Sequence, residues 1–146
     1  MISLDGIAPG MRIGLANLAV VISLYIFSAR NTLALVIMKC MMTAMLSGSI
    51  MALFYSVPAS FASLVAMYVL IKVKIASPVG VSVAGAAFHN TVQIIVAQFI
   101  LGTWGILIYL PFLLAVGTAS GVLIGMLAKL MLPKLWIYID SGSATS

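Results

Sequence analysis

The stretch PVGVSVAGAAFHNTVQIIVAQFIL, residues 78–101, decides the fold of this chain. It contains no Asp, Glu, Lys or Arg, and most of its residues are apolar or small. A helix needs about 20 such residues to cross the hydrocarbon core of a bilayer. The stretch therefore predicts a membrane-spanning helix that ends at Gly102.

Similar apolar stretches recur on both sides of this one, and 64% of the chain is hydrophobic while only 6% is charged. Soluble domains carry roughly a quarter charged residues, so this surface requires lipid as its solvent. We therefore predict an all-α integral membrane protein, a bundle of five transmembrane helices. The other four predicted spans are Met11–Ser28, Thr32–Gly48, Ala52–Ile71 and Gly105–Leu130.

No long polar segment interrupts these spans, which predicts a single transmembrane domain over residues 1–140 and a short, disordered polar tail over residues 141–146. Cationic residues collect in the loops on one side, whereas the other side has only Arg12, beside Asp5. The positive-inside rule then predicts an external amino terminus and a cytoplasmic carboxyl terminus. The cations on the cytoplasmic side are Arg30, Lys72, Lys74, Lys129 and Lys134.

The charge balance excludes several classes of function. The two acidic residues, Asp5 and Asp140, lie near the ends of the chain, and there is no Glu. Acid–base hydrolysis and proton coupling through a carboxylate both need acids within the spans. One Cys and one His cannot form a zinc site, and no P-loop motif occurs. The scattered basic residues form no nucleic-acid stripe. We expect no catalysis, metal or cofactor, but binding and translocation.

Lys39 lies near the middle of the second predicted span. A lysine at the centre of a membrane helix costs about 2.5–3.5 kcal/mol on insertion scales, so it usually faces a cavity or a partner. No carboxylate within the spans can pair with it, which leaves a backbone carbonyl, water or an anionic ligand. The alternative is that its long side chain extends along the helix towards the cytoplasmic interface. The sequence leaves both interpretations open.

The fourth span places its polar side chains on one stripe. At about 100° per residue, Ser82, Gly85, His89 and Gln93 share a face, and Asn90 lies at its edge. Polar side chains in a membrane helix need partners away from lipid, and small residues allow close approach. The stripe indicates a polar pocket inside the bundle. These groups could instead bridge helices by hydrogen bonds.

The fifth span carries Gly117, Gly121 and Gly125 at four-residue spacing, a pattern typical of helix packing. The pattern does not identify the opposing helix, which could belong to another subunit. Pro111 predicts a kink near the external end of this span. We predict that Cys40, the single cysteine, is buried and packs as a small hydrophobic residue.

Three stretches resemble the bacterial Gx transporter family, also known as heptaprenyl diphosphate synthase component I. They are Pro9–Asn17, Ser77–Gln93 and Tyr109–Pro111 followed by the glycines, and the resemblance runs from about residue 9 to residue 130. This family is distantly similar to the substrate-binding S components of energy-coupling-factor vitamin transporters, which are six-helix bundles served by a coupling subunit and ATPases. The resemblance implies that Lys39 takes the place of a basic residue, usually Arg.

The resemblance also implies that Gly10–Asn17 enters the bundle from outside. Family members carry a further helix before this segment, so we expect an S-component-like bundle whose first helix is missing, with that helix supplied by a partner or lost by truncation. The leading expectation is a substrate-binding transporter subunit of the bacterial cytoplasmic membrane that works with a coupling subunit and ATPases.

Its expected substrate is a small molecule, possibly anionic. We expect it to contact Lys39, Ser82, His89, Asn90 and Gln93, with Arg12 and Asn17 near the outer mouth. The alternatives are a non-catalytic accessory subunit of polyprenyl diphosphate synthesis and a scaffold for a membrane complex. The glycine pattern would be the working surface of such a scaffold.

Overall fold

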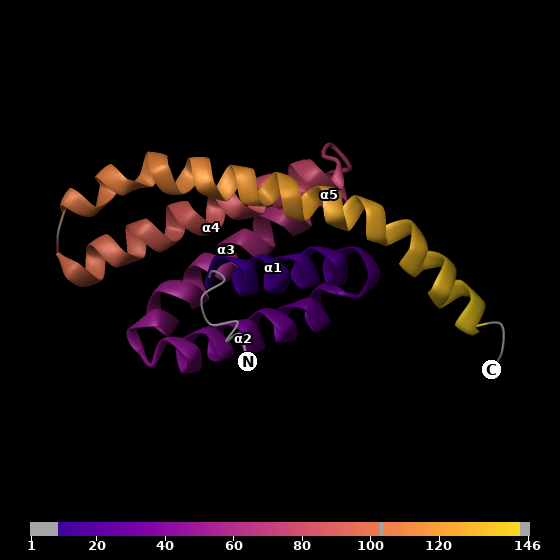
Figure 1. The fold of residues 1–146 in the computed structure, drawn as a ribbon, viewed down its shortest axis with the longest axis horizontal. Coiled ribbons are helices and arrows are strands. Elements are labelled where there is room, and N and C mark those ends of the chain that lie inside the picture. The colour runs from indigo at the N-terminus through magenta and orange to yellow at the C-terminus, as the bar shows by residue number, and fades with distance from the viewer. Residues whose placement is uncertain (1–8, 103, 144–146) are drawn as a thin grey trace, which may run out of the picture.

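The computed structural model describes residues 9–102 and 104–143, with side chains from residue 16 to residue 140. This part of the chain is helical and has no strand. The predicted all-α class is therefore correct. Figure 1 shows the arrangement of its elements. They are α1 (Pro9–Ile26), α2 (Ala29–Ser47), α3 (Met51–Val73), α4 (Pro78–Leu101), the 3-10 helix η2 (Trp104–Tyr109) and α5 (Leu110–Ser143).

Four segments of the described chain are long and apolar enough to cross a membrane: α2, α3, α4 and the continuous stretch Trp104–Asp140. Within α1, the segment Ala16–Ile26 forms a shorter apolar helix. The structure therefore supports a helical membrane protein, and the count of five spans stays a prediction.

The ends of α4 show how local sequence sets its limits. Ser77 precedes the helix in an extended conformation, and its side-chain oxygen accepts a hydrogen bond from the backbone N–H of Gly80. Pro78 occupies the first turn, where its missing N–H leaves no bond unmade. Gly102 ends the helix at φ +64°, a left-handed conformation that glycine adopts without strain. The predicted bounds of this span are correct.

Helix α4 lies between α3 and α5, the two helices against which it packs most extensively. Two glycines of α5, Gly121 and Gly125, face the backbone of α4. A Cβ atom added to Gly121 would lie 2.9 Å from the Cα of Val83, and one added to Gly125 would lie 2.5 Å from the Cα of Val79. The glycine pattern therefore packs α5 against α4 within this chain. It is not a free surface for another subunit, contrary to the scaffold interpretation.

Helix α1 contacts each of the other four α-helices, and in Figure 1 it lies between α2 and the α4–α5 pair. One face of α1 belongs to the apolar core through Leu18, Val20, Val21 and Leu24. The short connection to α2 is stabilised by a buried hydrogen bond of 3.0 Å between the hydroxyls of Ser23 and Thr32. These contacts fix α1 as a wall of the bundle interior.

Two expectations for the fifth span are wrong. Pro111 does not kink an α-helix, because α5 begins at Leu110 and Pro111 falls in its first turn, where proline is tolerated. The helix also does not end near Leu130: it runs through Pro133 to Ser143, across the predicted boundary at residue 140. Figure 1 shows this carboxy-terminal part projecting beyond the other helices. Residues 144–146 of the predicted tail lie outside the described part.

Candidate substrate cavity

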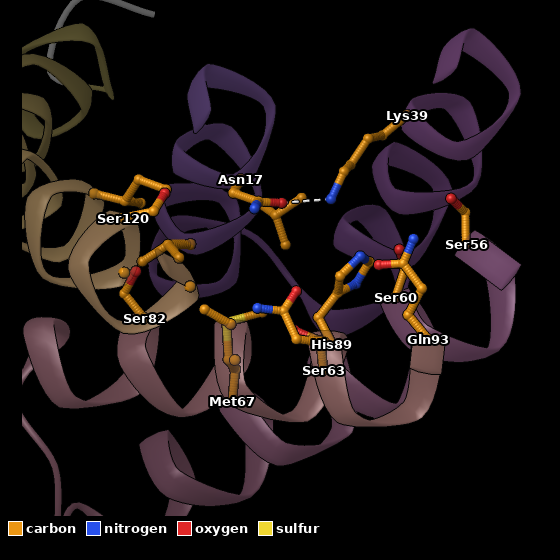
Figure 2. A pocket seen from close by; sticks show the side chains of 18 of the residues that line it. Asn17, Lys39, Ser56, Ser60, Ser63, Met67, Ser82, His89, Gln93 and Ser120 are labelled. Atoms are coloured by element: carbon orange, nitrogen blue, oxygen red, sulfur yellow. Dashed lines mark hydrogen bonds between the residues drawn. The ribbon is translucent and has the colours of Figure 1, made fainter. Parts of the chain in front are cut away.

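The bundle surrounds a partly open cavity of about 290 Å³, and each of the five α-helices contributes to its wall. Figure 2 shows polar side chains pointing into it from several helices. Its apolar lining includes Val20, Val21, Val36 and Ile124. Its polar lining consists of Asn17, Lys39, Thr43, Ser56, Ser60, Ser63, Ser82, His89, Asn90, Gln93 and Ser120.

Lys39 points into this cavity, and the interpretation that it extends towards the interface is wrong. Its Nζ donates a hydrogen bond to Oδ1 of Asn17, the contact drawn as a dashed line in Figure 2. Both residues lie near the middle of their helices, α1 and α2. The sequence did not reveal this partner, because the pairing depends on how α1 and α2 pack.

The bond to Asn17 leaves the lysine charge without a counter-charge. An amide oxygen is a neutral acceptor, and no Asp or Glu lines the cavity among the described residues. A charged group removed from water is costly unless an opposite charge or several hydrogen bonds compensate it. The cavity therefore combines a largely apolar wall with one basic side chain, and no acidic side chain among the described residues lines it.

The stripe on α4 faces the cavity as predicted. Ser82, Gly85, His89 and Gln93 all line it, and Ser82 is buried. His89 and Lys39 both line the cavity, and Figure 2 shows them on the same side of it. Among the described residues, Gln93 has no hydrogen-bond partner, so its amide is free to bind a ligand or water.

Asn90, at the edge of this stripe, behaves differently. Its Nδ2 donates a 2.7 Å hydrogen bond to the backbone oxygen of Leu113, and a Cβ atom added to Gly117 would collide with the same Nδ2. Asn90 therefore bridges α4 and α5, which is the structural role considered as the alternative for this stripe. The predicted packing role of Gly117 agrees with this contact, because the glycine leaves room for the Asn90 amide between the two helices.

Hydroxyl groups on α3, which were not predicted from the sequence, also face the cavity. Ser56, Ser60 and Ser63 all line the cavity, and Ser60 and Ser63 are buried. The Sγ of Cys40 lies 3.4 Å from Oγ of Ser60 and 3.7 Å from the backbone oxygen of Ser56, which joins α2 to α3. The signal was present in the sequence, since spacings of four and three residues place these serines on one helix face.

Gly85 lies against side chains of α3 beside the cavity. A Cβ atom at Gly85 would lie 2.6 Å from Sδ of Met67 and 3.2 Å from Oγ of Ser63. The predicted packing role of Gly85 agrees with these contacts. The side chain of Arg12 lies outside the described residues, so its predicted place near the outer mouth stays a prediction, whereas Asn17 lies in the cavity wall. The described residues bring no three His, Cys, Asp or Glu side chains together.

Fold and cavity together define a class: a helical membrane protein whose bundle surrounds a largely apolar cavity with one lysine and several polar side chains in its wall. The chain belongs to the heptaprenyl diphosphate synthase component I family, which its residues 1–131 match. The predicted resemblance to this family is thereby confirmed, while the distant similarity to S components stays a prediction. Neither the curated proteins nor the solved structures contain a match to the chain.

Proposed function

We propose that this protein is the membrane-embedded substrate-binding subunit of a bacterial small-molecule transporter, similar to an S component. The observation that carries the proposal is the cavity, to which every α-helix contributes and which holds a lysine near the middle of its helix. Ionisable residues at such positions in membrane helices usually mark solute or ion pathways. A separate coupling subunit with ATPases would supply the energy.

The chemistry of the lining supports binding over catalysis. Ligand sites combine apolar walls with a few polar groups that orient the ligand. Here valine and isoleucine side chains form the apolar walls, while hydroxyls, amides, one imidazole and one ammonium supply the polar groups. Rearranging covalent bonds in a diphosphate would need Mg²⁺ held by carboxylates. We therefore propose that the chain is not itself an enzyme.

In this proposal the protein lies in the bacterial cytoplasmic membrane with its amino terminus outside. Large apolar side chains on the outer faces of α2, α3 and α5, among them Met45, Phe61 and Leu123, are exposed in the isolated chain and would contact lipid. The loop cations would then face the cytoplasm, where a coupling module with its ATPases could bind.

The test is to purify the tagged chain from its native membrane in lipid nanodiscs and identify what co-elutes. We expect an ATPase-containing module and, by mass spectrometry of the denatured sample, a bound solute. The variant Lys39→Met should lose the solute, while Lys129→Met, which removes a cation from an exposed position on α5, should retain it. A chain that elutes without an ATPase module and without any solute contradicts the proposal.

A second candidate function rests on the family name. Heptaprenyl diphosphate synthase component I suggests a subunit that anchors or regulates a soluble prenyl synthase. In that case the same purification yields a prenyl synthase, and adding the chain to the synthase in nanodiscs raises the rate of chain elongation. Lys39→Met would then leave co-elution unchanged, because the lysine faces the bundle interior and not an outer surface.

A further inference from the structure

The charge inside the cavity restricts what can bind there. Lys39 is the single Lys or Arg among the described lining residues, and its partner, the Asn17 oxygen, is neutral. A ligand with one negative charge would neutralise the ammonium. A neutral ligand would leave it uncompensated, and a ligand with two or more negative charges would bring an excess charge of its own into a low-dielectric interior.

The groups around Lys39 also suit a small, flat acceptor. Figure 2 shows Lys39, His89, Ser60 and Gln93 gathered on one side of the cavity, with Ser82 and Ser120 on the other. Ammonium, amide and hydroxyl groups can donate several hydrogen bonds to two carboxylate oxygens. The volume of about 290 Å³ lies just below the usual range for ligand pockets, about 300–1,000 Å³, which favours a small ligand.

From these observations we infer that the cavity selects a small monocarboxylate. Its carboxylate would lie between Lys39, His89 and Gln93, and its body would extend towards the hydroxyls of Ser82 and Ser120. The ligand would take the place that Oδ1 of Asn17 now holds on the ammonium. This inference rests on the proposed binding function and adds the charge class of the substrate. It also excludes the diphosphate head of a prenyl substrate from this cavity.

The test uses four probes that share a benzene ring and differ in the attached group: benzoate, benzamide, phenyl phosphate and benzylamine. Dissociation constants are measured with the full chain in nanodiscs by ligand-observed NMR at constant ionic strength. Benzoate should bind at least tenfold more tightly than each of the others. Lys39→Met should weaken benzoate at least tenfold and remove its advantage over benzamide. Lys39→Arg, which keeps the charge, should preserve the order of affinities.

Lys129→Met is the matched control and should bind benzoate as the wild type does. Circular dichroism and thermal melting of each variant confirm that it is folded. The inference is overturned if benzamide binds as tightly as benzoate, if phenyl phosphate binds best, if benzoate affinity does not depend on Lys39, or if no probe binds. A preference for benzamide would leave the proposed transporter function intact. That function is judged separately, by co-elution of the ATPase module and a solute.

Discussion

Replacing Gly125 by alanine should destabilise the protein, even though alanine is the better helix former. An ordinary contact between two carbon atoms is about 3.5–4.0 Å. The new Cβ would lie 2.5 Å from the Cα of Val79 and 3.1 Å from the backbone oxygen of Pro78. Both neighbours are backbone atoms that cannot rotate away, so α4 and α5 would have to separate by about 1 Å.

The magnitude follows from two opposing effects. Gly→Ala in a helix interior stabilises by about 0.5–1 kcal/mol through backbone entropy. Overpacking an interface costs about 1–3 kcal/mol, and a gap of about 1 Å removes up to about half of each dispersion contact that spans it. Because α4 and α5 form the most extensive helix pair of the bundle, the loss exceeds the gain. We expect the free energy of unfolding to fall by about 1–2 kcal/mol.

The assay is reversible unfolding in mixed micelles of increasing SDS content, followed by circular dichroism. Gly121→Ala provides an intermediate case, since its Cβ would lie 2.9 Å from the Cα of Val83. Gly105→Ala is the control, because a Cβ atom there meets no atom within 4 Å. Stability should therefore decrease in the order Gly105→Ala, Gly121→Ala, Gly125→Ala. Equal stability of Gly105→Ala and Gly125→Ala would refute the close packing of α4 on α5.

Three further predictions concern the cavity and its wall. Without ligand, Lys39→Met should raise the free energy of unfolding by about 1 kcal/mol. An ammonium in the middle of the membrane costs about 2.5–3.5 kcal/mol, and removing that cost outweighs the loss of one charged hydrogen bond of about 1.5–3 kcal/mol. A lower stability of the variant in SDS unfolding would contradict this. Asn90→Ala should lower the free energy of unfolding by about 0.6–1.7 kcal/mol, because the hydrogen bond to Leu113 is lost. The affinity for benzoate should change less than threefold. A tenfold loss of that affinity would instead make Asn90 a ligand contact. Cys40 is only 2% exposed, so it should react with maleimide only after the protein unfolds. Mass spectrometry measures the labelled fraction over time. Rapid labelling of the folded protein would show that the cavity wall opens.

Hydropathy and helix periodicity are properties of single segments, and for this reason the sequence alone predicted much of the architecture. The lack of charge in residues 78–101, its N-terminal Ser77-Pro78 and its closing Gly102 define α4 with correct ends. The same periodicity correctly placed Ser82, His89 and Gln93 on one face. The role of these side chains in binding stays a prediction.

Tertiary structure decided the features that depend on two segments at once. Only the packing of α1 on α2 brings Asn17 to Lys39 and turns that lysine inward, and only the approach of α5 to α4 assigns the glycines a partner within the chain. Asn90 became a bridge to Leu113 because that carbonyl lies opposite it on α5. Periodicity states which face of a helix is polar, but the groups that oppose this face are set by the arrangement of the other helices.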